Sequence, residues 1–201
     1  GLQYMHRNNV AHRDCVRNNM GMDANPMFTC HRRAFHHSCT CCPPTHFLID
    51  FGQSRMYNPS QPCPSEYALK PGSYTPPEGD ADIPCDPFAT DVYILGTMIR
   101  TSFLDGDSNS YKPGVHGFEF LRPFVNDMIA DNPSNRPTMN EVASWFSSIV
   151  GKLQWWKLRS QAVQKDEFNL TTLFHALYHL FWMTLMMLLF KPAIPSPKDL
   201  H

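Results

Sequence analysis

The chain has 201 residues with a formal net charge of −1, and 42% of its residues are hydrophobic. This length suits one large domain or one domain with an extension, and the apolar share is large enough for a packed core. The balanced charge gives no reason to expect nucleic acid or an anionic membrane surface as a partner.

Cysteine usage and the first residues indicate the compartment. The chain has seven cysteines, an odd number, and it begins at Gly1 without a basic and then apolar leader. These features favour a reducing, intracellular setting, and we expect a cytoplasmic protein. Because the first residue is not Met, we also expect the chain to be a fragment of a longer protein.

The first residues predict a helix end, a polar loop and a strand. Segment 1–9 is typical of the last turns of a helix, because its apolar residues fall on one face. The polar sequence His12-Arg13-Asp14 follows, and we expect it in a loop between rigid elements. Residues 19–23 then predict a short strand.

Residues 27–46 are rich in cysteine and histidine. Cys39 and Cys42 form a C-x-x-C pair, and sulfur and imidazole ligands suit zinc. The other cysteines and histidines show no clean second spacing, which favours a polar insertion loop instead. Both interpretations stay open.

The next stretch predicts a strand and a long loop. The apolar run 46–49 predicts a strand that leads into Asp50-Phe51-Gly52. Residues 53–72 contain several prolines and glycines and no hydrophobic period, so we expect a long functional loop. Pro76-Pro77-Glu78 closes this loop.

Three amphipathic helices are predicted after Pro87. Their apolar residues recur every three to four positions, which indicates one buried face on each helix. Thr138 is a predicted N-cap of the third helix, with Glu141 at the capping-box position. The residues expected in the core are Val92, Leu95, Ile99, Phe103, Leu121, Phe124, Val125, Met128, Ile129, Val142, Phe146 and Ile149.

Five short motifs follow one another along the chain. They are His12-Arg13-Asp14 with Asn19, Asp50-Phe51-Gly52, Pro76-Pro77-Glu78, Asp91 through Gly96, and Asn132 through Pro137. Together they resemble the carboxyl-terminal lobe of a eukaryotic protein kinase. The resemblance implies a mainly α fold over 1–150, with short β-hairpins around the catalytic loop, an insertion at 27–46 and an activation segment at 50–78. A helical tail, 151–201, follows.

The resemblance also implies roles for individual residues. Asp14 would be the catalytic base, and Arg13 would pair with the 50–78 segment or with a phosphorylated residue in it. The hydroxyl residues that could carry that phosphate are Ser54, Ser60, Ser65, Ser73 and Thr75. Asn19 and Asp50 would bind Mg²⁺ and, through it, the phosphates of ATP.

Four further residues would be structural under the same resemblance. We expect Glu78 and Arg136 to form a buried ion pair, and Asp91 to hold the backbone of the catalytic loop, of which His12 is part. The implied partners are a nucleotide and a protein substrate.

The chain departs from the family in two ways. It holds no amino-terminal lobe, so we expect the full-length parent to phosphorylate protein serine or threonine and this fragment to be weak or inactive. Val16 stands where serine/threonine kinases usually carry lysine. The alternative is a catalytically inactive, pseudokinase-like binding module.

The tail carries a long apolar run. Residues 173–190 contain few polar side chains, and a helix of this length approaches the thickness of a bilayer's hydrocarbon core. Packing of this helix against protein is the favoured interpretation. Membrane association through it is the alternative.

Overall fold

The computed structural model describes residues 1–23, 44–62, 64–70, 74–107, 112–160, 162–166 and 170–190. The chain divides into two compact units, residues 1–21 with 47–151 and residues 22–46 with 152–201. Helices predominate over small antiparallel sheets, in keeping with a mainly helical fold. The assignment of 1–150 to a kinase lobe and of 151–201 to a tail stays a prediction, and most of the 27–46 insertion lies outside the described residues.

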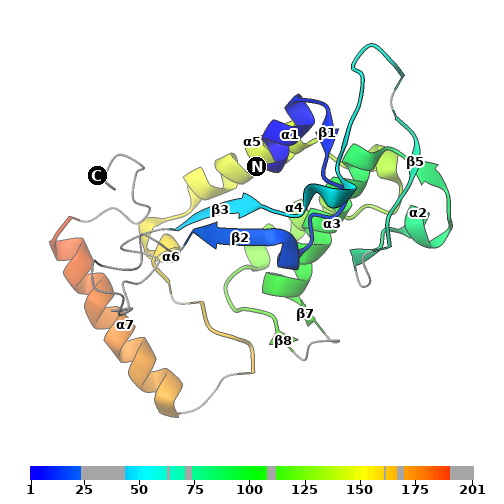
Figure 1. Ribbon diagram of the computed structural model, residues 1–201. Coiled ribbons are helices and arrows are strands. Elements are labelled where there is room, and N and C mark those ends of the chain that lie inside the picture. Colours follow the sequence, from blue (N-terminus) through cyan, green and yellow to red (C-terminus); the bar gives the residue numbers. More distant parts are fainter. Residues whose placement is uncertain are drawn as a thin grey trace. The chain divides into compact units, whose positions relative to one another are not determined.

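The first unit begins with helix α1 (Leu2–Arg7), which ends at Asn8. Gln3 Nε2 and Arg7 Nε both donate to Asn140 Oδ1, at 3.1 and 2.9 Å. These bonds tie α1 to helix α5 (Met139–Lys152), beside which it runs in Figure 1. Strand β1 (Val10–Ala11), the 3₁₀ turn η1 (Arg17–Asn19) and strand β2 (Met20–Asp23) follow.

All the described sheets have two strands. β1 pairs antiparallel with β4 (Arg55–Met56), so that Ala11 lies opposite Arg55. β5 (Glu66–Tyr67) pairs with β6 (Pro84–Cys85) in the same sense. The others are β2 with β3 (Thr45–Leu48), and β7 (Gly106–Asp107) with β8 (Lys112–Pro113). The pairing of β1 with β4 links the chain before Asp14 to the 50–78 segment.

Capping residues mark where the central helix of the first unit begins. Asp86 caps helix α3 (Pro87–Ile99) by accepting from Phe88 N at 2.9 Å, and Pro87 occupies the first turn. α3 continues as a π-helical turn, η5 (Arg100–Leu104). The remaining elements are η3 (Phe51–Gln53), α2 (Pro77–Asp80), η6 (Glu119–Leu121), α4 (Arg122–Met128) and η7 (Pro133–Asn135).

The core lies where α3 meets α4. Gly96 lets the two helices approach, because a Cβ there would lie 2.8 Å from both Ile129 Cγ2 and Met128 Cβ. Cys15 is fully buried in the same core, and its Sγ donates to the Asp91 carbonyl oxygen at 3.3 Å. The core consists of Leu2, Cys15, Val92, Ile94, Leu104, Leu121, Phe124, Val125, Met128, Met139 and Val142.

Two predicted core residues are not in the core. The Phe103 side chain is 39% exposed and that of Phe146 is 48% exposed. Phe103 falls in η5, where the α-helical period is interrupted, and α5 buries a stripe too narrow to include Phe146.

The predicted capping box at the start of α5 is confirmed, since Thr138 N donates to Glu141 Oε2 at 2.7 Å and Glu141 N donates to Thr138 Oγ1 at 3.4 Å.

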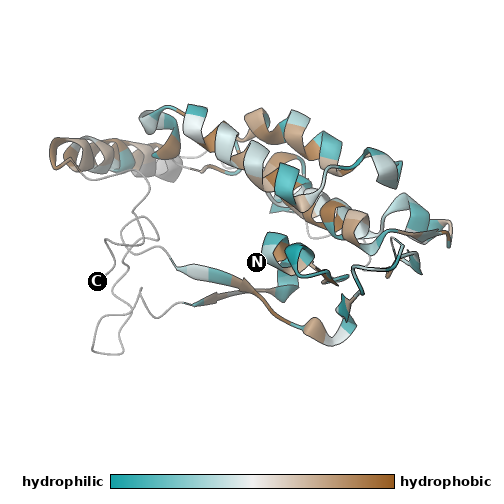
Figure 2. Cartoon of the chain, turned by 90° about the horizontal axis from the view of Figure 1, so that it is seen from above, coloured by the Kyte–Doolittle hydropathy of each residue, from teal (hydrophilic) through white to brown (hydrophobic). Residues whose placement is uncertain are grey.

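The second unit contains helices α6 (Trp155–Leu158) and α7 (Leu170–Leu188). Figure 2 shows that apolar residues dominate α7. The helix predicted for the apolar run 173–190 is therefore present as α7, which begins three residues and ends two residues earlier than that run. Across the described ranges, none of the helices combines the length and the apolar character needed to cross a membrane.

Candidate functional site

Asp91 holds the loop formed by residues 12–19. This aspartate is fully buried on α3, and its two carboxylate oxygens accept from the backbone N–H groups of His12, at 2.7 Å, and Arg13, at 2.6 Å. Arg13 has a φ of 68°, in the left-handed region that residues with a Cβ rarely adopt. The short charge-assisted bonds from Asp91 stabilise this unusual backbone conformation.

The His12 side chain joins the 12–19 loop to the chain that enters the 50–78 segment. Its Nε2 lies 3.2 Å from the Ile49 carbonyl oxygen, and its Nδ1 lies 3.3 Å from the backbone nitrogen of Asp14. Because a carbonyl only accepts and a backbone N–H only donates, the contacts require a proton on Nε2 and a free Nδ1. The ring orientation is thereby fixed between the two segments.

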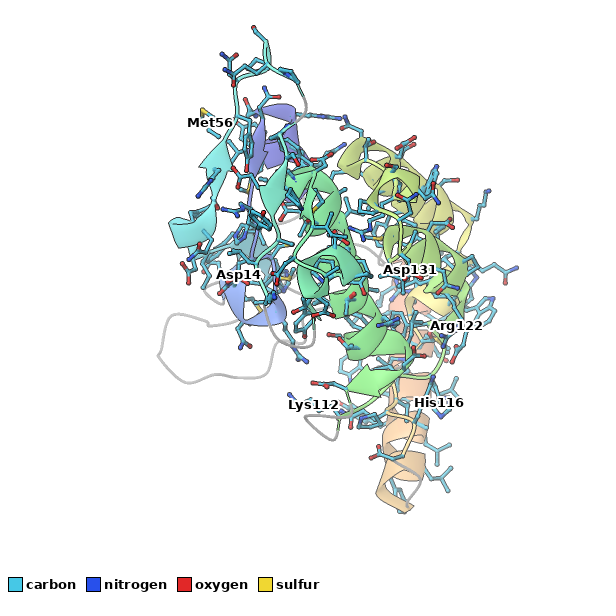
Figure 3. All side chains as sticks on the ribbon, turned by 90° about the vertical axis from the view of Figure 1, so that its right-hand side faces the viewer. Asp14, Met56, Lys112, His116, Arg122 and Asp131 are labelled. Carbon is cyan, nitrogen blue, oxygen red and sulfur yellow. The ribbon has the colours of Figure 1, made fainter. Side chains whose placement is uncertain are left out.

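The structure brings Asp14 and Asn19 together. The Asn19 amide nitrogen donates to the Asp14 carbonyl oxygen and to Asp14 Oδ2, both at 2.9 Å. The turn η1 makes this contact possible, with Asn19 N donating to the Val16 carbonyl oxygen at 3.0 Å. Figure 3 labels Asp14 in this loop. One carboxylate oxygen of Asp14 therefore has a fixed donor.

A backbone hydrogen bond connects the residue before Asp50 to Asn19. Ile49 N donates to the Asn19 carbonyl oxygen at 2.9 Å, so Asp50 follows directly on the residue bound to Asn19. Asp50 is exposed, has a φ of 60°, and accepts from Gly52 N at 3.3 Å. In the described part of the chain, no hydrogen bond joins its side chain to Asp14 or Asn19.

The chemistry of these groups fits a small, hard cation. Asn19 uses its amide nitrogen on Asp14, which leaves its side-chain oxygen available, and the Asp50 carboxylate faces solvent. Mg²⁺ prefers oxygen ligands and often binds through one or two protein groups, with water and phosphate completing its shell. The described residues hold no cluster of three or more His, Cys, Asp or Glu side chains suited to a metal. The fit is therefore to Mg²⁺ bound with a phosphate, and not to a metal held by protein alone.

Glu78 and Arg136 form a bidentate pair away from this loop. Arg136 donates from both terminal nitrogens to the two carboxylate oxygens, at 2.6 and 2.7 Å, and from Nε to the Ala130 carbonyl oxygen at 2.8 Å. Burial alone raises the pKa of Glu78, but the hydrogen bonds and charge of Arg136 outweigh it and bring the pKa below its ordinary value. The pair joins α2 to the turn after α4, which is a structural position.

Sequence reasoning missed Glu66. Its Oε2 lies 3.1 Å from Arg13 Nη2, and its Oε1 lies 2.8 Å from Arg55 Nη1. Arg13 also donates to the Tyr67 carbonyl oxygen at 3.2 Å. No spacing rule links these positions, because the contact depends on β5 being placed beside the 12–19 loop. The sequence predicted that Arg13 pairs with the 50–78 segment or with a phosphorylated residue in it, and the partner that the structure shows in this segment is the carboxylate of Glu66. Of the hydroxyl residues named for that phosphate, Ser73 lies outside the described residues.

Comparison with known proteins adds no relative. No model of a known protein family matches the chain, and no curated protein matches it either. The function of the chain is therefore inferred from the geometry of this site and from the motif order in the sequence.

Proposed function

We propose that the chain belongs to a protein kinase that transfers the γ-phosphoryl group of ATP to serine or threonine hydroxyls of a protein substrate. The observation that carries the proposal is the contact between Asp14 and Asn19, with Asp50 introduced beside Asn19 through the Ile49 backbone. An acid and an amide of one loop thus contact each other, and a second acid directly follows a residue that is hydrogen-bonded to that loop, in the order of the kinase motifs.

Asp14 has the properties of the proton acceptor. Its Oδ2 is held by Asn19, and its other oxygen is left for a substrate hydroxyl. A positioned general base of this kind contributes about 10²–10⁴-fold to rate. The adjacent loop backbone is fixed by Asp91, which keeps the base in one orientation.

Asp50 and Asn19 are the residues that would hold Mg²⁺. Bound there, the ion would neutralise charge on the phosphates during transfer. The exposure of Asp50 leaves its carboxylate open to such a ligand, and the backbone hydrogen bond from Ile49 to Asn19 joins the chain next to Asp50 to Asn19.

A binding module without catalysis is the second candidate, and one observation favours it. Three large apolar side chains near the site are exposed, namely Phe47 at 47%, Ile49 at 40% and Phe51 at 54%. Exposed apolar clusters often mark protein interaction surfaces. In that case Asp14 and Asn19 would serve only to brace the loop.

Two measurements separate the candidates. The first is the thermal shift of the chain with ATP and Mg²⁺, where stabilisation is expected for wild type and loss of it for Asp50→Asn. The second is transfer of labelled phosphate by the full-length parent to a serine- and threonine-containing protein, which Asp14→Asn should abolish without loss of the thermal shift. Asp127→Asn, an exposed acid on α4, is the matched control and should change neither. A full-length parent that shows neither shift nor transfer would favour the binding module.

A further inference from the structure

One face of helix α7 is partly covered by the chain itself. His179, Met183 and Met186 are partly buried, and their spacing of four and three residues places them on one side of the helix. His179 Nε2 also lies 2.6 Å from the carbonyl oxygen of Arg159, the residue that ends α6. A partner of α7 would therefore bind a different face of the helix.

A second face of α7 is apolar, exposed and regularly spaced. Leu173, Leu177 and Leu180 are 57%, 56% and 52% exposed. Thr184 is also exposed, and Met187 is 46% exposed. The five positions follow one another at steps of four, three, four and three residues, which is the a and d spacing of a coiled coil. At 3.6 residues per turn, this line of five residues, the leucine seam, lies about a third of the way around the helix from the covered face.

Thr184 is the one polar member of the leucine seam, and its hydroxyl is already satisfied. Its Oγ1 donates to the Leu180 carbonyl oxygen at 2.9 Å, one turn earlier in the same helix. A hydroxyl bonded in this way needs no partner outside the helix for its proton, so an apolar surface can cover it without leaving a donor unpaired. The seam can therefore be buried along its whole length.

The exposed area is large enough for a stable contact between two proteins. A second apolar row, Phe174, Phe181 and Leu188, runs beside the leucine seam, and its side chains are 68%, 64% and 66% exposed. With a large side chain taken at 150–250 Å² in full, the seam and this row together expose roughly 800 Å². A specific interface of standard size buries about 800 Å² on each partner. One α7 against another therefore reaches the area that a stable dimer needs.

The chemistry of α7 favours a second copy of the chain over a lipid surface. Residues 170–188 include no Lys, Arg, Asp or Glu. Helices that lie in a membrane interface typically carry Lys and Arg on a polar face, and α7 has no such face. A second copy presents the same leucine seam, and two identical seams are self-complementary about a two-fold axis.

We propose that the leucine seam of α7 is the docking surface for α7 of a second copy of the chain. The two helices pack as a short coiled coil, in which the seam residues of each fill the spaces between those of the other. Leu180 is the middle of the five positions, so it lies at the centre of the contact whether the helices run parallel or antiparallel. This inference is independent of the proposed function.

The first test measures the dimer dissociation constant of the 201-residue chain by analytical ultracentrifugation. Wild type should form a concentration-dependent dimer, and Leu180→Lys should raise its Kd by about 30-fold or more, as for a central contact residue. Tyr178→Lys is the matched control, because Tyr178 is 64% exposed on the same helix but lies away from the leucine seam. Its Kd should equal that of wild type. A monomeric wild type, or equal weakening by the two substitutions, would overturn the proposal.

A second test separates loss of docking from loss of folding. Leu180→Lys and Leu180→Glu should each be monomeric, and an equimolar mixture of the two should form dimers again, because opposite charges then meet at the centre of the contact. Circular dichroism should show the same helix content in both variants as in wild type. A mixture that stays monomeric would overturn the proposal.

A third measurement distinguishes a lipid surface from a second copy. Wild type should not co-sediment with vesicles of phosphatidylcholine, and dimers should form equally well with and without the vesicles. Co-sedimentation that Leu180→Lys and Tyr178→Lys reduce to the same extent would assign α7 to lipid and overturn the proposal, because a lipid surface does not distinguish the leucine seam from the other exposed faces.

Discussion

Arg136 meets Glu78 through two parallel hydrogen bonds although 58 positions separate them in the chain. Arg136 also lies over the Tyr93 ring, 4.6 Å from its centre, so the guanidinium is in contact with α3 as well. Both charged side chains are almost fully buried. The pair therefore ties α2 and the turn after α4 to the central helix.

Removing one member of this pair should destabilise the first unit strongly. Arg136→Met leaves the Glu78 carboxylate buried without its partner, which typically costs about 3–5 kcal/mol. Urea unfolding at neutral pH, followed by tryptophan fluorescence, measures the loss. Arg122→Met is the matched control, because Arg122 makes an exposed pair with Asp105, and it should change the stability little. Equal losses for the two variants would contradict the structural role of Arg136.

The Glu78–Arg136 pair should also contribute to acid sensitivity. The pKa of Glu78 is lower in the folded protein than its ordinary value of 4.5, so the unfolded chain binds that proton more tightly. The stabilisation is therefore complete above about pH 4.5 and is lost as the pH falls through the folded-state pKa. The difference in unfolding free energy between wild type and Glu78→Gln should narrow between pH 7 and pH 3. A gap that stays constant over this range would contradict the lowered pKa.

Asp91→Asn should loosen the 12–19 loop. The carboxylate accepts from two backbone N–H groups, and an amide presents a donor to one of them, so one bond is replaced by a repulsive contact. Hydrogen bonds to charged groups contribute about 1.5–3 kcal/mol each, and we expect a loss of this size or more. Amide exchange at His12 and Arg13 should accelerate in this variant. Slow exchange at both positions would exclude Asp91 as their anchor.

Gly96→Ala should destabilise the helix pair at the core. The added methyl group would lie 2.8 Å from atoms of Met128 and Ile129, and overpacking of this kind costs about 1–3 kcal/mol. Gly151→Ala in α5 is the control, because no atom lies within 4 Å of its Cβ position. There the higher helix propensity of alanine should stabilise the protein by about 0.5–1 kcal/mol. Thermal unfolding of the two variants should thus shift in opposite directions.

The helices were the predictable part of this fold. Periodic apolar residues locate α3, α4 and α5, and Thr138 with Glu141 marks where α5 begins, because these signals are local. The same logic fails at Phe103, where a π-helical turn shifts the period. Strands of two residues carry no pattern long enough to be recognised, and the pairings of β4 and β5 could not be foreseen.

The candidate site was predictable in its members and in one of its supports, Asp91, which binds the loop backbone as the sequence predicted, but not in Glu66. Motif order identifies Asp14, Asn19 and Asp50, and the contact between the first two agrees with that grouping. The roles of these residues stay predictions. Glu66 escaped notice because its contact with Arg13 depends on the placement of β5, a tertiary feature that sequence spacing does not encode. The predicted zinc alternative falls mostly on residues outside the described ranges.

The burial of Cys15 beside Asp91 provides the protein with an internal reporter. Its thiol is fully enclosed, and burial followed by the Asp91 charge raises its pKa well above the ordinary value. A thiol-modifying reagent reacts with the thiolate, so it can reach Cys15 only in molecules whose core has transiently opened. The modification rate of this single sulfur, followed by mass spectrometry, would therefore measure how often the anchored loop and the central helix separate in the native protein.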